Sequence, residues 1–279
     1  MSRAKLLSVI VPGRNEQFMR HTVDDFLVHS GEDTEVIAVL DGYWPDPPLE
    51  NHPRLQIIQF SEPVGQRGAT NAGAKLSQAK YIMKVDAHCA ADDKFDEKMT
   101  ADMQPDWTMI PSMHRLHVYD WGCEGCGERT YQGTLPAKCE ECGGESFYMH
   151  MVWEPRWEFE PTVAWRFDRN MQFQYWRKYH RQPEVQEEAK SGLIATMSCI
   201  GCCFLMDRER FWKLGGMDEG HGSWGQFGTE LSCKAWLSGG AMMTSLKTWV
   251  AHLFRTGNFF SSQPCLQLLS PKLQVFRGF

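Results

Sequence analysis

The segment Tyr81-Ile-Met-Lys-Val-Asp-Ala-His88 decides how this chain folds and what it can bind. Its apolar part reads as a short buried strand, and two polar side chains follow where that strand ends. In an extended chain, residues two apart point to the same side, so Asp86 and His88 can direct an oxygen and a nitrogen at one point. Such a mixed ligand set suits manganese or a similar divalent cation. Asp-x-His pairs also occur in ordinary loops, so the meaning of this pair depends on the rest of the chain.

Buried strands that end in polar residues recur along the first ninety residues. Apolar runs occupy residues 6–11, 36–40 and 55–60, and helical segments open at Arg14-Asn15-Glu16 and at Gly65. Apolar strands that alternate with helices predict an α/β fold with a mainly parallel central sheet. Ligands of such sheets bind beyond the carboxyl ends of the strands, where Pro12, Asp41 and Asp86 all fall.

Length and composition limit the class of protein. A chain of 279 residues can form one large core or two smaller ones, and 42% hydrophobic with 23% charged residues is typical of globular proteins. The net charge of −6 argues against a surface that is basic all over but allows a local basic groove. No apolar run approaches the ~20 residues that span a bilayer, and the first apolar run is too short for a signal peptide. We therefore expect a cytoplasmic protein with no membrane span.

Four of the ten cysteines form two pairs, Cys123-Glu-Gly-Cys126 and Cys139-Glu-Glu-Cys142, with twelve residues between the pairs. This spacing is a strong zinc signature, and glycines beside the thiols allow tight turns. Disulfides would require an oxidising compartment, for which the chain offers no export signal. We predict an inserted zinc ribbon at about residues 120–148, which either acts as a structural staple or grips a nucleic acid or protein partner.

Several of these segments together resemble a known family. Val9-Ile-Val-Pro-Gly-Arg-Asn-Glu16, Val39-Leu-Asp41, residues 65–73 and Val85-Asp-Ala-His88 are similar to the nucleotide-binding half of GT-A glycosyltransferases. The resemblance is to family 2 and, more closely, to the polypeptide N-acetylgalactosaminyltransferases, whose metal motif is Asp-x-His. It implies one GT-A domain over residues 1–279, with a nucleotide-binding half at about 1–110 and an acceptor half at about 150–260. The nucleotide-sugar-binding residues that it implies are Pro12, Arg14, Glu16, Asp41, Arg67, Asp86 and Trp224.

The resemblance continues through residues 196–236, with one departure. We expect a buried strand to Met206, followed by a helix capped by Asp207. Glu230 matches the last acid of a family motif, but the acid expected three residues earlier is Phe227 here. Glu230 is therefore the candidate catalytic group on the acceptor side, as general base or as a ligand of the donor sugar. The alternative is a surface glutamate on an amphipathic helix.

The segment Thr248-Trp-Val-Ala-His-Leu-Phe-Arg255 resembles the His-x-Phe-Arg segment of the same family. Without that resemblance, His252 would read as a core histidine on an apolar strand. The resemblance makes it the third metal ligand and gives Arg255 a catalytic role at the donor diphosphate. Residues 256–260 would then form a mobile lid.

The predicted function is metal-dependent transfer of a hexose or N-acetylhexosamine from a UDP-sugar to a hydroxyl of a macromolecule. Asp86, His88 and His252 would hold Mn²⁺ or Mg²⁺, and the cysteines a structural Zn²⁺. One acceptor is a hydroxylated base in DNA, as in bacteriophage genomes, which would put the protein in the cytoplasm of a bacterial host. A protein or a cell-envelope glycan is the alternative.

Residues 165–181 bear on the choice of acceptor because they interleave aromatic with basic side chains. They could follow a phosphate backbone and stack on bases, or form an amphipathic element with solvated arginines. A further alternative is a non-catalytic binding protein that keeps a transferase fold and uses the zinc ribbon as its interaction surface. Phe227 in place of an acid supports this alternative, and the complete metal triad opposes it.

Overall fold

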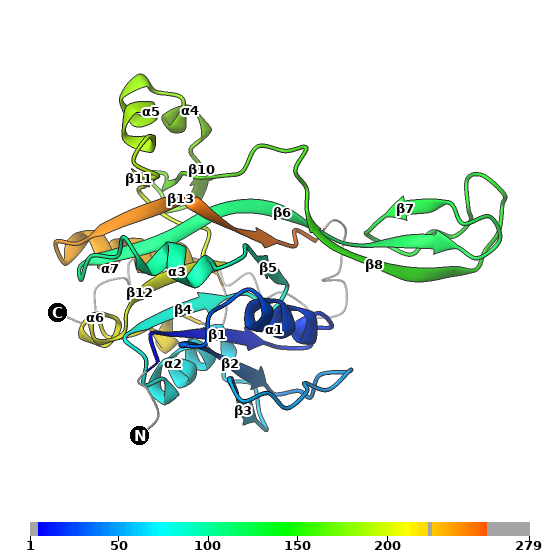
Figure 1. Ribbon diagram of the computed structural model, residues 1–279, viewed down its shortest axis with the longest axis horizontal. Coiled ribbons are helices and arrows are strands. Elements are labelled where there is room, and N and C mark those ends of the chain that lie inside the picture. The colour runs from blue at the N-terminus through cyan, green and yellow to red at the C-terminus, as the bar shows by residue number, and fades with distance from the viewer. Residues whose placement is uncertain (1–4, 223–224, 256–279) are drawn as a thin grey trace.

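The computed structural model describes residues 5–222 and 225–255. One mixed sheet forms its centre (Figure 1). The strands follow the order β11 (Leu193–Ala195), β13 (Ala241–His252), β6 (Trp107–Cys123), β12 (Cys203–Asp207), β4 (Tyr81–Val85), β1 (Leu7–Gly13), β2 (Thr34–Asp41) and β3 (Leu55–Phe60). Off this path, β5 (Cys89–Ala91) pairs with β13, and β7 (Arg129–Tyr131) and β8 (Phe147–Pro155) pair with β6, while β9 (Trp165–Phe167) and β10 (Phe173–Tyr175) form a separate hairpin.

The four strands nearest the N-terminus are parallel, as the sequence predicts. β1 pairs with β2 on one side and with β4 on the other, and β2 pairs with β3. β12 then enters antiparallel between β4 and β6, which makes the whole sheet mixed. β13 runs parallel to β6 and ends at His252, so this residue reaches the same edge of the sheet as the end of β4.

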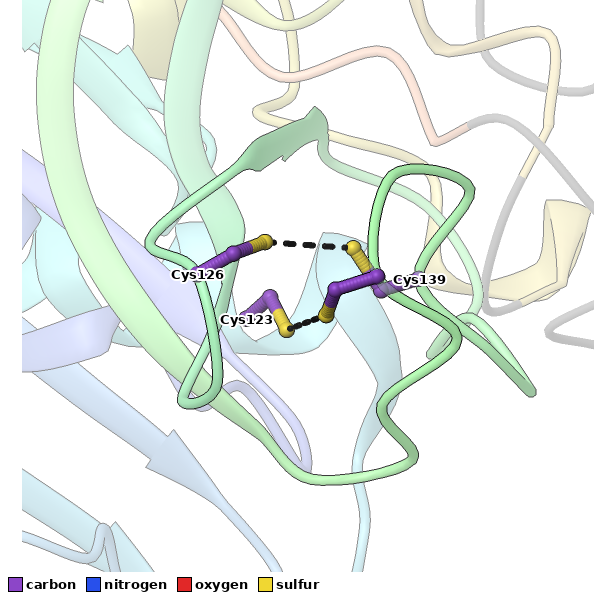
Figure 2. Close-up of side chains that lie close together, drawn as sticks. Cys123, Cys126 and Cys139 are labelled. Atoms are coloured by element: carbon purple, nitrogen blue, oxygen red, sulfur yellow. Dashed lines mark hydrogen bonds between the residues drawn. The ribbon is translucent and has the colours of Figure 1, made fainter.

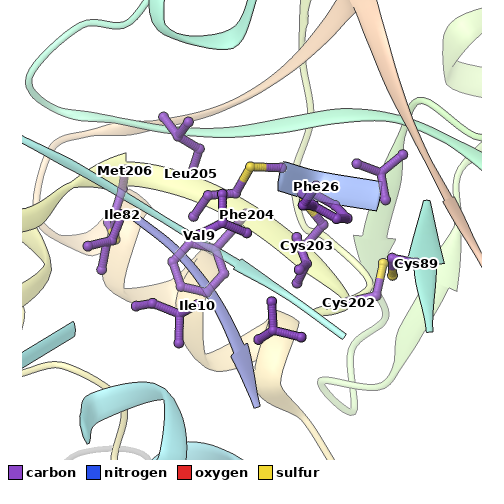
Figure 3. Packing of buried hydrophobic residues seen from close by; sticks show 14 of the residues in the cluster. Val9, Ile10, Phe26, Ile82, Cys89, Cys202, Cys203, Phe204, Leu205 and Met206 are labelled. Atoms are coloured by element: carbon purple, nitrogen blue, oxygen red, sulfur yellow. The ribbon is translucent and has the colours of Figure 1, made fainter. Parts of the chain in front are cut away.

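Burial of apolar side chains explains why these segments are strands. Every residue of β1, β2 and β4 is buried, whereas the edge strand β3 alternates in exposure. Val9, Ile82 and Phe204 belong to one continuous core across β1, β4 and β12 (Figure 3). Full burial of each such side chain stabilises the fold by about 1.5–3 kcal/mol. Cys202 and Cys203 also lie in this core, as small buried residues.

Helices flank the sheet: α1 (Met19–Val28), α2 (Gly65–Leu76), α3 (Phe95–Thr100), α6 (Arg208–Lys213), η1 (Glu219–His221) and α7 (Phe227–Leu237). Two more, α4 (Arg177–His180) and α5 (Pro183–Ala189), lie beyond its β11 edge. In α2, a Cβ on Gly73 would lie 2.4 Å from Ile10 Cγ2, so a glycine is needed for the helix to approach β1. Asp207 caps α6 by accepting a hydrogen bond from the Arg210 backbone N–H, as predicted. Each described helix is too short to cross a bilayer.

One helix begins later than the sequence suggests. α1 starts at Met19, and residues 14–16 lie in the loop that follows β1. The buried Glu16 side chain accepts a hydrogen bond from the Phe18 backbone N–H at 3.1 Å and faces the sheet edge. This contact helps to hold the Glu16 side chain in the loop, outside the helix.

β6 extends beyond the central sheet and forms a projecting arm with β7 and β8 (Figure 1). A small apolar cluster that includes Phe18, Val118, Tyr119 and Leu253 anchors the base of the arm. Cys123 pairs with Phe147 where β6 and β8 meet at the far end. The two cysteine pairs therefore lie at the end of the arm, away from the core.

Candidate active site

Three predicted metal ligands converge at the carboxyl edge of the sheet. Asp86 and His88 follow β4, and His252 ends β13. The Nε2 atom of His252 lies 3.2 Å from Asp86 Oδ2 and 3.1 Å from His88 Nε2. The three ligand atoms lie within 4.8 Å of one another. Two imidazole nitrogens and a carboxylate oxygen that face one point form a donor set suited to a divalent cation.

Glu16 lies directly behind His88. Its Oε2 atom is 2.9 Å from His88 Nδ1, so the ring donates a proton there and leaves a lone pair on Nε2, toward the other two ligands. The Arg255 guanidinium donates to the same carboxylate oxygen. Burial by itself raises the pKa of Glu16. The hydrogen bond and charge of His88, with the charge of Arg255, together have a larger effect in the opposite direction, so the pKa lies below its ordinary value. The structure thus brings Glu16 and Arg255 to the triad.

Asp86 is held by two residues that the sequence reasoning did not single out. Lys84 Nζ donates to Asp86 Oδ1 and to the Gly201 carbonyl oxygen, the latter at 2.8 Å. Gln66 Nε2 donates to Asp86 Oδ1 at 2.9 Å. Burial raises the pKa of Asp86, but the Lys84 charge and the two histidines hold it far below its usual range. The sequence does contain a feature that could have identified Lys84. It is a lysine in an otherwise apolar strand, and it lies two residues before Asp86 and therefore on the same side of the strand.

Asp41 and its neighbours at the ends of β1 and β2 are arranged around the start of α2. The Asp41 carboxylate accepts hydrogen bonds from the backbone N–H groups of Val64 at 2.6 Å and Gly65 at 3.0 Å, so it satisfies the first amides of that helix. Pro12 is buried in β1, and Arg14 is exposed in the loop that follows. Trp224 and the predicted lid at 256–260 lie outside the described residues.

Arg67 and Glu230 form a buried ion pair, with 2.8 Å between Arg67 Nε and Glu230 Oε2. Arg67 also donates to the carbonyl oxygens of Gly222 and Gly225, at 3.1 and 2.7 Å. The other Glu230 oxygen accepts from the Asp218 backbone N–H at 2.7 Å and from Lys234 Nζ at 2.8 Å. Both Glu230 oxygens are therefore engaged in holding α2, α7 and the loop around Asp218 together.

Phe227 packs against two cations at the position where the family has an acid. Its buried ring lies 4.9 Å from Lys84 Nζ and 5.6 Å from the Arg67 guanidinium carbon. Each cation–π contact stabilises by about 0.5–2 kcal/mol, depending on desolvation. The ring therefore partly replaces the charge compensation that a carboxylate would supply to Lys84 and Arg67.

The four cysteines of the arm lie together as two knuckles, one around each cysteine pair. Figure 2 shows Cys123, Cys126 and Cys139 of this cluster. The Sγ atoms of Cys123 and Cys142 are 3.5 Å apart, and those of Cys126 and Cys139 are 3.6 Å apart. Tetrahedral zinc with Zn–S bonds of ~2.3 Å requires sulfurs ~3.8 Å apart, close to these values.

The backbone around the thiols repeats in both knuckles. The N–H of Gly127 donates to the Cys123 carbonyl, and that of Gly143 to the Cys139 carbonyl, each at 2.9 Å. Both glycines have positive φ, at 77° and 72°. Backbone N–H groups of Cys126 and Gly125 lower the pKa of the Cys123 thiol to about 7. These features fit one structural zinc ion.

Comparisons with known proteins agree with this geometry. Residues 8–120 match the model of glycosyl transferase family 2. The chain is 34% identical to polypeptide N-acetylgalactosaminyltransferase 10 of Rattus norvegicus over 261 residues, and 25% identical to that of Homo sapiens, in each case over 89% of this chain and 38% of the relative. It is 24% identical to a probable N-acetylgalactosaminyltransferase 9 of Caenorhabditis elegans, over 76% of this chain and 32% of the relative. The chain thus spans less than half the length of these relatives.

A solved structure shows the same fold. The crystal structure of GalNAc-T7 with UDP, GalNAc and Mn²⁺ matches with a TM-score of 0.63 and 17% identity, over 91% of this chain and 45% of that chain. The strand order described above is therefore a GT-A fold. Together with the family match, this identifies the chain as one that carries a glycosyl transferase family 2 domain and is homologous to the polypeptide N-acetylgalactosaminyltransferases.

Proposed function

We propose that this protein transfers a sugar from a UDP-sugar donor to a hydroxyl group of a macromolecule, in a reaction that depends on a divalent cation. The observation that carries this proposal is the convergence of Asp86, His88 and His252 at the carboxyl edge of the sheet. The family 2 match supports the sugar transfer. The Mn²⁺ and UDP in the GalNAc-T7 crystal support the choice of cation and donor.

Each residue at the triad has a role in this proposal. Asp86, His88 and His252 hold Mn²⁺ or Mg²⁺, which when bound would offset the negative charge on the diphosphate as the sugar–phosphate bond breaks. Glu16 fixes the ring of His88 through its contact with Nδ1. Lys84 keeps Asp86 ionised and oriented. Arg255 lies at the rim of the triad and adds positive charge beside the diphosphate.

The nucleotide is held by residues at the ends of β1 and β2. We assign Pro12, Arg14, Asp41 and Arg67, in the half at about residues 1–110, to nucleotide-sugar binding, together with Trp224 from the second half. The acceptor is assigned to the half at about 150–260. Asp41 and Arg67 act by fixing α2, because their side chains already bind its first amides and Glu230. Glu230 has a positioning role in preference to a general-base role, because it accepts three hydrogen bonds from protein groups.

The arm binds Zn²⁺ through Cys123, Cys126, Cys139 and Cys142, as an inserted zinc ribbon at about 120–148. The acceptor is a hydroxylated base in DNA or, as the second candidate, a protein or cell-envelope glycan. The cytoplasmic location predicted from the sequence is part of the same proposal.

A nucleotide-sugar screen tests the proposed function. Thermal unfolding of the protein is followed with UDP, UDP-sugars and other nucleotide sugars, each with and without Mn²⁺. A bound ligand raises the unfolding temperature by mass action. Because the proposed site binds the diphosphate through the cation, UDP and UDP-sugars should stabilise the wild type only with Mn²⁺. They should not stabilise the Asp86→Ala variant, with or without Mn²⁺. If no nucleotide stabilises the wild type, the non-catalytic binding protein is the better account.

A further inference from the structure

A cleft of about 490 Å³ lies beside the metal triad, between β6 and residues 158–181. Phe254 lines this cleft, and its ring contacts that of His252 with centroids 4.8 Å apart. Met113, another lining residue, has its sulfur 3.6 Å from Cys202 Sγ, and the Cys202 carbonyl accepts the Asp86 backbone N–H at 2.9 Å. Phe254 therefore separates the cleft from His252, so the cleft borders the triad at this wall.

Two arginines from different elements line the cleft without a carboxylate partner. Arg115 comes from β6 and Arg177 from α4, and within residues 5–222 and 225–255 neither forms an ion pair. Both lie near Tyr175: burial raises the pKa of its hydroxyl, and the charges of Arg115 and Arg177 act in the opposite direction. The two guanidinium groups therefore place uncompensated positive charge in one part of the cleft.

The two carboxylates of the cleft are already paired. Glu158 lies 2.6 Å from Arg156 Nε, and Glu160 lies 3.6 Å from Arg181 Nη2. Carboxylates can accept hydrogen bonds from sugar hydroxyls, but here each carboxylate lies beside an arginine that offsets its charge. The charge left over in the cleft is positive, which favours an anionic ligand.

Exposed aromatic rings accompany these arginines. Phe159 and Tyr175 are 41% and 42% exposed, and both line the cleft. The Arg115 guanidinium lies 5.2 Å from the Phe159 ring centroid, and that of Arg177 lies 5.9 Å from the Tyr175 centroid. Aromatic rings beside cations are the surface on which the bases of a single strand stack while its phosphates are neutralised.

A buried histidine and an exposed tryptophan meet in the wall of the cleft. His114 lines the cleft, and its ring packs edge-on against Trp157, which is 61% exposed. Its Nδ1 atom is buried and has no hydrogen-bond partner among the described residues.

We propose that this cleft is the acceptor site and binds a single-stranded phosphodiester chain, with Arg115 and Arg177 on phosphates and Phe159 and Tyr175 against bases. This inference rests on the proposed function and names its acceptor class. An enzyme that modifies a base must take it out of the duplex stack, which fits a cleft that accepts an unpaired strand. The bound strand would present a base hydroxyl to the triad across the Phe254–His252 contact.

Strand binding can be measured without catalysis, by fluorescence anisotropy of labelled oligothymidylate and oligouridylate at several salt concentrations. The wild type should bind at least one of the two. The Arg115→Gln/Arg177→Gln double variant should bind about tenfold more weakly, and its salt slope should fall by ~1.4, because each phosphate that an arginine neutralises contributes ~0.7 to the slope. The matched control is Arg166→Gln/Arg169→Gln, which removes the same charge from exposed residues outside the cleft and should change affinity less than about twofold.

Three results would overturn the inference: no strand binding by the wild type, equal affinity in the cleft variant, or equally weakened binding in both double variants. Thermal shift with UDP and Mn²⁺ separates this failure from that of the proposed function. A cleft variant that keeps the nucleotide shift is folded and donor-competent, so its strand affinity reports on the cleft alone. Strand binding with no nucleotide shift in the wild type would support the cleft and contradict the proposed transferase activity.

Discussion

The Nδ1 atom of His88 lies 2.9 Å from Oε2 of Glu16, and this contact turns the opposite ring nitrogen toward Asp86 and His252. A carboxylate behind a ligating histidine fixes its tautomer and raises its basicity. The arrangement joins the loop after β1 to the end of β4, so the first strand of the fold helps to build the triad.

Removing this carboxylate should weaken cation binding. We expect Glu16→Ala to lower Mn²⁺ affinity in the presence of UDP by about 10–100-fold, because the His88 ring loses the acceptor that orients it. Glu16→Gln should lose less, since its amide oxygen can still accept from Nδ1. Isothermal titration with Mn²⁺ measures both values. Unchanged affinity in the alanine variant would show that Glu16 does not support the triad.

The Arg67–Glu230 pair should contribute to stability through its burial. Arg67 is 1% exposed and Glu230 10%, so Glu230→Gln leaves the Arg67 charge buried without its carboxylate, whereas Arg67→Met leaves Glu230 paired with Lys234. We expect Glu230→Gln to lower the free energy of unfolding by about 3 kcal/mol, Arg67→Met to lower it by less, and the double variant to lower it by clearly less than the sum. Urea denaturation of the four proteins gives the coupling.

The same variants also test the role of Glu230. A positioning role predicts that Glu230→Gln reduces turnover modestly and in proportion to lost donor affinity. A general base would instead lose about 10²–10⁴-fold in kcat with KM unchanged. The latter result would restore the catalytic role that the sequence suggests.

The cysteine cluster should hold one zinc ion per chain. We expect Cys126→Ser to lose this zinc and to expose residues 124–146 to limited proteolysis, because the end of the arm has little apolar core of its own. The control is Cys233→Ser, a half-buried thiol outside the cluster, which should keep the zinc. Metal analysis of the purified proteins decides the matter, and a zinc-free wild type that folds normally would contradict the prediction.

The parallel half of the fold and the Asp86–His88 pair could be predicted because they depend on neighbouring residues. Apolar runs that end in polar residues are visible in the sequence, and β1, β2, β3 and β4 follow them. The metal-ligand role of His252 could be predicted only from the family resemblance, because nothing in the residues around a single histidine on an apolar strand indicates metal binding.

Contacts between distant residues could not be predicted. Glu16 and His88 are 72 residues apart, and Arg67 and Glu230 are 163 apart, so neither pair leaves a periodic trace in the sequence. The sequence also does not predict that β12 lies antiparallel between β4 and β6, because a buried strand has the same composition in either direction. The roles of the site residues and the division into two halves stay predictions.

The most direct test of the central claim is UDP release from UDP-sugars by the wild type and by Asp86→Ala, with Mn²⁺ and after removal of divalent cations. Asp86→Ala removes one of the three converging ligand atoms and leaves the other residues of the proposed nucleotide-binding half unchanged. We predict release by the wild type that requires the cation, and a loss of about 10²-fold or more in the variant. Equal release by both proteins, or release unaffected by chelation, would contradict a metal-dependent transferase built on Asp86, His88 and His252.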